Sequence, residues 1–205
     1  MNTIVLIEDH EMMRRGISEW ITDTGQWKVV GEAASLDEAH VLFDSYPEPP
    51  DLVLLDISLR KDFGLDLIPW LKEKYPCAAG ENSKPAILVY SVYQGYTLIQ
   101  EAMRRGALGY VCKTNSDAEF ATAIESVLLG KRYIDQNLTQ KIFAVPDILI
   151  GLTKREREIF SLVQNGMDNR GIAKTLAIHR GTVENYISRL YDKTGAKNRE
   201  DLKKL

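Results

Sequence analysis

The chain has 205 residues, of which 26 are Lys or Arg and 29 are Asp or Glu, giving a formal net charge of −3 at pH 7. This length allows one or two domains with a sizeable core. The sequence contains no run of about 18 apolar residues, so no membrane span is predicted. The N-terminus lacks a signal pattern. Cys77 and Cys112 are the only cysteines, which argues against a disulfide framework and favours the reducing cytoplasm.

Apolar runs of strand length alternate with segments of helical spacing over residues 1–130. The apolar runs are Thr3–Ile7, Trp27–Gly31, Leu52–Asp56, Ala86–Ser91 and Gly109–Cys112. The helical segments are His10–Thr22, Leu36–Ser45, Gly64–Lys74, Tyr93–Arg105 and Asp117–Leu129. Five such units in succession predict an α/β fold with a five-stranded, doubly wound parallel sheet. Strands buried on both faces are continuously apolar, as these runs are.

Carboxylates stand at the ends of two predicted strands. Glu8 and Asp9 follow the first apolar run, and Asp56 follows Leu55 in the third. The carboxyl ends of parallel strands meet at the edge where open α/β folds bind ligands, so these acids are predicted to share one site. Oxygen ligands of this kind suit Mg²⁺. With its charge neutralised, Asp56 could act as a nucleophile and form an acyl phosphate.

Two further strand ends carry groups that suit a transferred phosphoryl group. Ser91 ends the fourth run and Lys113 follows the fifth. A lysine considered alone is more often a solvated surface residue. The alignment of both residues with the acids is what favours a common site, since a phosphoryl group needs positive charge and hydrogen-bond donors.

Charge changes sign along the chain. Residues 151–205 hold 12 Lys and Arg against 7 Asp and Glu, a net charge of +5, whereas residues 1–150 hold 14 against 22, a net charge of −8. This predicts a domain at 1–130, a linker at 131–148 with a short helix around Thr139–Ala144, and a basic domain at 149–205. The basic domain is the candidate for nucleic-acid binding.

Four helices are predicted in the basic domain. Thr153 and Glu156 form a capping box that opens the first, and Gly166 ends it. The others are Asn169–Leu176, about Arg180–Thr194, and a short helix after Asn198. Short helices joined by a tight turn in a basic unit indicate a helix-turn-helix. Its candidate DNA contacts are Asn169, Arg180, Thr182, Val183, Asn185, Tyr186, Ser188, Arg189 and Lys193.

The motifs Glu8-Asp9, Asp56, Ser91 and Lys113, with Tyr110 three residues before the lysine, resemble the receiver domain of bacterial two-component response regulators. Segments such as Leu152–Glu158 and Thr182–Tyr186 resemble a LuxR-type helix-turn-helix. Together they resemble the NarL/FixJ class over nearly the whole chain. The resemblance implies a flavodoxin-like receiver fold followed by an all-α domain.

The resemblance also implies a function. Asp56 would accept a phosphoryl group from a histidine kinase. Glu8, Asp9, Asp56 and the backbone carbonyl of Ser58 would bind Mg²⁺. Ser91 and Lys113 would contact the phosphoryl group, and Tyr110 would change rotamer. The protein would be a non-enzymatic, cytoplasmic transcriptional regulator without membrane contact, binding promoter DNA at a two-fold symmetric site as a homodimer.

Several positions depart from the family pattern. Val92 replaces a small residue after Ser91, and we expect slow phosphoryl turnover from its bulk. Glu184 replaces a lysine; it could pair with Arg180, accept from cytosine N4, or lower non-specific affinity. His179 replaces a Ser or Thr cap, so the recognition helix could start at Gly181-Thr182. Gly171 replaces a glutamate and weakens its helix.

Two alternatives stay open on the sequence. One is a phosphate-independent regulator or partner-binding protein with weak DNA affinity. The other is a metal-dependent phosphatase with Asp56 as the nucleophile. Such an enzyme would need a second acid two residues on, where this chain has Ser58.

Overall fold

The computed structural model describes residues 1–59, 62–76, 84–135 and 152–205. The predicted helix around Thr139–Ala144 and most of the predicted linker lie outside these ranges. The chain divides into two compact units, one of Met1–Val92 with Ala102–Ile134 and the other of Tyr93–Glu101 with Asp135–Leu205. No helix among the described residues is long and apolar enough to span a membrane.

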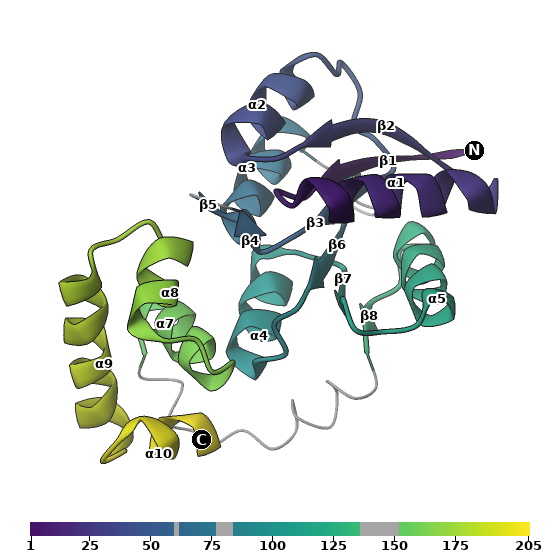
Figure 1. Ribbon diagram of the computed structural model, residues 1–205. Coiled ribbons are helices and arrows are strands. Elements are labelled where there is room, and N and C mark those ends of the chain that lie inside the picture. The colour runs from purple at the N-terminus through teal and green to yellow at the C-terminus, as the bar shows by residue number, and fades with distance from the viewer. Residues whose placement is uncertain (60–61, 77–83, 136–151) are drawn as a thin grey trace. The chain divides into compact units, whose positions relative to one another are not determined.

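The first unit is built on one parallel sheet (Figure 1). Its strand order is β2-β1-β3-β6-β7-β8, the doubly wound order with a crossover point between β1 and β3. The strands are β1 (Asn2–Ile7), β2 (Trp27–Ala33), β3 (Leu52–Leu55), β6 (Ala86–Ser91), β7 (Gly109–Cys112) and β8 (Tyr133–Ile134). The five predicted strands are confirmed. The sixth strand, β8, was not predicted; it lies within the range predicted as linker and pairs with β7.

Helices of the first unit follow the strands as predicted. They are α1 (Glu11–Thr24), α2 (Leu36–Asp44), the 3₁₀ turn η1 (Gly64–Asp66) with α3 (Leu67–Lys74), and α5 (Asp117–Leu128). The helix α4 (Tyr96–Arg105) is divided between the two units. Ser35 caps α2 by accepting from Glu38 N at 3.1 Å, and Ser116 and Glu119 form a capping box on α5, which fixes where these helices begin.

Alternation along the strands sends side chains to both faces of the sheet. Helices α1 and α5 cover one face (Figure 1). There Leu6 and Leu54 join Ile21 of α1 and Ile124 of α5 in one cluster, each at most 1% exposed. Val5, Ile7, Val53 and Leu55 alternate with these residues and are fully buried as well. Both faces of the sheet are therefore sealed, which leaves its carboxyl edge for chemistry.

A short antiparallel hairpin follows β3 and was not predicted. Its strands are β4 (Ser58–Leu59) and β5 (Asp62–Phe63). Gly64 closes it, with its N–H donating to the Ile57 carbonyl at 2.8 Å. A Cβ at Gly64 would overlap the carbonyl oxygen of Asp56, so only glycine lets the backbone pass this close to the end of β3.

Four helices lie in the described residues 152–205 of the second unit. They are α7 (Lys154–Gln164), α8 (Asn169–Thr175), α9 (Arg180–Thr194) and α10 (Arg199–Lys204). Their core consists of Ile159, Phe160, Leu162, Val163, Ile172, Val183, Leu190 and Leu202, all fully buried. The capping box at Thr153 and Glu156, the end of α7 before Gly166 and the cap at Asn198 are confirmed.

The start of α9 corrects one expectation. The helix begins at Arg180, not at Gly181-Thr182. His179 takes the cap position, and its Nδ1 accepts from the Gly181 amide at 3.3 Å. An imidazole nitrogen can thus supply the acceptor that a Ser or Thr hydroxyl would otherwise provide.

Candidate functional site

Backbone hydrogen bonds run past the strand ends and hold the candidate residues in register. The N–H groups of Glu8, Asp56 and Lys113 donate to the carbonyls of Ala33, Ile7 and Ser91 at 2.9 to 3.0 Å. Because these bonds continue the ladders of β2-β1-β3 and β6-β7, they bring side chains from distant parts of the sequence to one edge. The structure brings Glu8, Asp56 and Lys113 together at this edge.

Lys113 bridges two carboxylates at this edge. Its Nζ lies 2.5 Å from Glu8 Oε2 and 2.8 Å from Asp56 Oδ2. The side chains of all three residues are 7% exposed or less. A buried acid is costly unless it is paired, and the bridge gives each carboxylate a cation.

Burial shifts the ionisation of the group. Desolvation raises the pKa of Asp56 to about 6; Lys113 opposes the rise and the nearby Glu8 adds to it. For Lys113, desolvation favours the neutral amine, but the attraction of Asp56 and hydrogen bonds to both carboxylates outweigh it and raise its pKa. The ammonium therefore stays charged at neutral pH, whereas burial disfavours the ionised form of Asp56 overall, although Lys113 stabilises it.

Three acids at the edge have the chemistry of a divalent cation site. Oxygens of Glu8, Asp9 and Asp56 lie within 4.8 Å of one another, and Asp9 is the most exposed of the three. Hard carboxylate oxygens fit Mg²⁺. The Ser58 amide lies 3.4 Å from Asp56 Oδ1, which places its backbone beside the site, while the ligand role of its carbonyl stays a prediction.

The two other predicted members of the site lie inside the sheet. Ser91 and Tyr110 are both fully buried. Ser91 pairs with Cys112 at the ends of β6 and β7, and Tyr110 pairs with Val89 two residues earlier. The serine thus stands on the strand end that accepts the Lys113 backbone hydrogen bond.

Helix α9 turns one face to its neighbours and another to solvent. Val183, Ile187 and Leu190 are buried at helical spacing. The exposed residues of α9 are Arg180, Thr182, Glu184, Asn185, Ser188, Arg189, Asp192 and Lys193. Tyr186 is partly buried, with the Arg189 guanidinium 5.6 Å from its ring centre. Six of the predicted DNA-contacting residues, Lys193 among them, are therefore accessible on this helix.

Three of the predicted DNA contacts, including the exposed Lys193, pack against or pair with other residues of the same domain. Val183 is fully buried in the core, so its side chain is not on the exposed face of α9. Asn169 accepts from Arg199 Nη1 at 2.7 Å, and Lys193 Nζ lies 2.6 Å from the buried carboxylate of Glu156. We propose that these two polar residues hold helices together instead of contacting DNA.

Comparisons with known proteins match both units. The family model for the response regulator receiver domain matches residues 4–125, and the model for bacterial regulatory proteins of the luxR family matches residues 151–205. The DNA-binding transcriptional activator DevR/DosR of Mycobacterium tuberculosis is 31% identical over 97% of this chain and 91% of its own length. The nitrate/nitrite response regulator NarL of Escherichia coli is 30% identical over 96% and 91%. The chain belongs to the LuxR-family response regulators.

A solved structure agrees with this assignment. The two-component response regulator of the LuxR family from Aurantimonas sp. SI85-9A1 has a TM-score of 0.61 and 30% identity, covering 69% of this chain and 94% of that one. This response regulator is therefore a DNA-binding transcriptional regulator of a two-component system.

Two residues beside the response regulator's acidic site were missed from the sequence. Tyr90 lies under Lys113, whose Nζ is 5.6 Å from the ring centre. Arg14 donates from Nη1 to the Glu8 carbonyl at 2.7 Å and pairs with Glu32 at 3.3 Å. Neither residue stands at a strand end, which was the signal that revealed the others.

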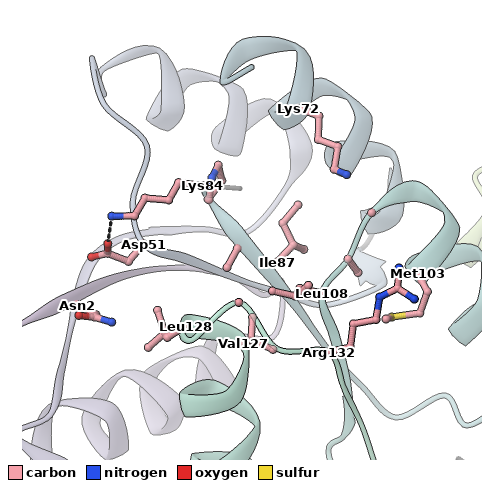
Figure 2. A pocket seen from close by; sticks show the side chains of 15 residues that line it. Asn2, Asp51, Lys72, Lys84, Ile87, Met103, Leu108, Val127, Leu128 and Arg132 are labelled. Carbon is pink, nitrogen blue, oxygen red and sulfur yellow. Dashed lines mark hydrogen bonds and ion pairs between the residues drawn. The ribbon is translucent and has the colours of Figure 1, made fainter. Parts of the chain in front are cut away.

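A cavity of about 500 Å³ lies at the opposite edge of the response regulator's sheet (Figure 2). Its walls include the starts of β1 and β6, and the residue Asp51 that precedes β3. Asp51 pairs there with Lys84 at 2.7 Å. Because it adjoins the amino ends of the strands, the cavity is separate from the carboxylate site.

Proposed function

We propose that Asp56 is the phosphoryl acceptor of this regulator and that a partner histidine kinase is the donor. The observation that carries the proposal is the buried cluster in which Asp56 lies beside Glu8 and Asp9 and pairs with Lys113. In the transfer, an Asp56 oxygen forms a bond to phosphorus while the phosphorus–nitrogen bond of the phosphohistidine breaks. The departing imidazole nitrogen keeps the electron pair.

The surrounding residues would divide the work of the transfer. Glu8, Asp9 and Asp56 would hold Mg²⁺, which supplies positive charge against the phosphoryl oxygens when bound. Lys113 already reaches Asp56 with its ammonium and would pair with the added phosphoryl group. Ser91 would donate its hydroxyl proton to a phosphoryl oxygen, and the movement of Ser91 would be followed by a rotamer change of Tyr110.

The output would be promoter binding through α9. Arg180, Asn185 and Arg189 can donate to base edges, and Thr182 and Ser188 can reach phosphates. A homodimer would read two half-sites related by two-fold symmetry. The net charge of +5 over residues 151–205 favours the approach of this domain to DNA.

The test measures phosphorylation and DNA binding on the same samples. Full-length protein is incubated with a small phosphodonor and Mg²⁺, and its intact mass and promoter-fragment retention are measured on the same samples. We expect a mass gain of one phosphoryl group and stronger retention in the wild type, and neither in Asp56→Asn.

The matched control is Asp44→Asn, which removes an aspartate with a 67% exposed side chain on α2 and should leave both results unchanged. A mass gain that persists in Asp56→Asn would refute the acceptor assignment. Wild-type retention that does not respond to phosphate would identify a phosphate-independent regulator.

A further inference from the structure

Arg180 and Glu184 form an exposed ion pair at the start of α9. Arg180 is the first residue of the helix, and its Nε donates to Glu184 Oε1 at 2.9 Å. The side chains of Arg180 and Glu184 are 68% and 49% exposed. The amino-terminal part of a recognition helix is the part that approaches base edges, so the pair lies where sequence is read.

The pair is poorly arranged for stabilising its own helix. A basic residue in the first turn faces the positive end of the helix dipole, and the order Arg then Glu is the weaker orientation of an i,i+4 pair. On α1 the pair Glu11–Arg15 has the favourable order. Exposed pairs contribute little to stability in any case, which points to a role for Arg180 and Glu184 outside folding.

The ion pair uses only the Nε donor of Arg180 and leaves the other donors of its guanidinium available. Glu184 engages Nε of Arg180, and a guanidinium carries four further N–H donors on Nη1 and Nη2. Two terminal nitrogens in one plane match the O6 and N7 acceptors of guanine. The carboxylate also restricts the rotamers of a long side chain, which lowers the entropy lost on binding.

We propose that Glu184 positions Arg180 to read a guanine and that this pair sets the base preference at one position of each half-site. The inference rests on the proposed DNA binding by α9. Glu184 adds a second effect, because its negative charge cancels that of Arg180 and repels phosphates. The pair would favour the correct base while lowering affinity for DNA of other sequence.

The test measures base preference directly. Full-length phosphodonor-treated protein selects sites from randomised DNA, and affinities are then measured for the selected site and for versions with its half-site guanines replaced. We expect the wild type to prefer guanine at one position per half-site by roughly 5- to 100-fold. Arg180→Lys, which keeps the charge but loses the planar fork, should lose that preference.

Two variants of Glu184 separate position from charge. Glu184→Gln keeps an oxygen that can accept from Nε, so the guanine preference should persist while non-specific affinity rises. Glu184→Ala removes the acceptor, so the preference should fall. The salt dependence should steepen by about one phosphate contact, or about 0.9 in the logarithmic slope, as Arg180 turns to the backbone.

The matched control is Glu200→Gln, which removes an exposed acid paired with Lys203 at 2.6 Å on α10 and should leave the base preference unchanged. An unchanged guanine preference in both Arg180→Lys and Glu184→Ala overturns this inference alone. A wild-type protein that binds no DNA at low salt overturns the proposed function, and the inference with it.

Discussion

At the scale of single residues, Lys113 couples the stability of the protein to its chemistry. Its ammonium lies between Glu8 and Asp56, so the two acids are held together before any phosphoryl group arrives. The arrangement is still costly for Asp56, whose pKa burial raises to about 6. The proposed acceptor residue therefore lowers the stability of the fold that positions it.

That cost predicts a pH-dependent effect of Asp56→Asn. The folded pKa of about 6 exceeds the ordinary aspartate pKa of 3.8, so between these values the folded state binds more protons than the unfolded state and stability falls as pH rises. Above pH 6, in a chelator, Asp56→Asn should stabilise by on the order of 1–3 kcal/mol. Thermal melts at pH 7.5 should show this gain and melts at pH 4 should not; an equal gain at both would contradict it.

Val92 predicts a change in phosphoryl lifetime. It follows Ser91 in the chain and is 55% exposed, so its side chain is not needed to fill the core. If its bulk restricts water near the acyl phosphate, Val92→Ala should shorten the lifetime of the phosphorylated form without changing the melting temperature. A time course of phosphoprotein decay measures this, and unchanged decay would refute it.

At the scale of elements, the hairpin after β3 depends on one close approach. Gly64→Ala would press a methyl group against the Asp56 carbonyl, and we expect a loss of about 1–3 kcal/mol in unfolding free energy. Gly16→Ala is the control, since a Cβ there has no neighbour within 4 Å and should stabilise α1 by up to about 1 kcal/mol. Chemical denaturation compares the two, and equal effects would contradict the packing argument.

Helices α7 and α9 are joined by the pair of Lys193 and Glu156. The glutamate is buried; desolvation opposes its ionisation, but bonds from Lys193 and Thr153 outweigh this and lower its pKa. Lys193→Met should cost about 1 kcal/mol of stability, whereas Lys203→Met, which breaks an exposed pair, should cost less. If Lys193→Met weakens DNA binding without lowering the melting temperature, Lys193 contacts DNA as the sequence predicted.

The accuracy of the sequence-based prediction depended on the length of each element. Strands of four to six continuous apolar residues were found at nearly their observed bounds, and with them the strand-end residues Glu8, Asp56, Ser91 and Lys113. Strands of two residues, β4, β5 and β8, have no periodicity to detect. Side-chain partners were harder to predict. The pairing of Glu184 with Arg180 was one of several options, and the bridge by Lys113 was not foreseen, because such contacts depend on distances that a sequence does not contain.

At the scale of the whole molecule, residues 1–150 carry a net charge of −8 and residues 151–205 a net charge of +5, a difference of thirteen charges. If two copies bind related half-sites, affinity must depend on the helical phase between those sites. Inserting about five base pairs between them should weaken binding by the phosphorylated protein, and about ten should restore part of it. Gel retardation on this series tests the dimer; indifference to spacing would indicate independent monomers.

The ends of four strands meet at Asp56, and their residues come from positions 8 to 113 of the chain. A nascent, misregistered or partly unfolded chain contains the same amino acids but no acceptor, since the bridge from Lys113 exists only when β1, β3, β6 and β7 are aligned. Phosphorylation of Asp56, if it occurs as proposed, would therefore require a folded chain. Only correctly folded copies would then take part in signalling, and misfolded copies would not be phosphorylated even before they are degraded.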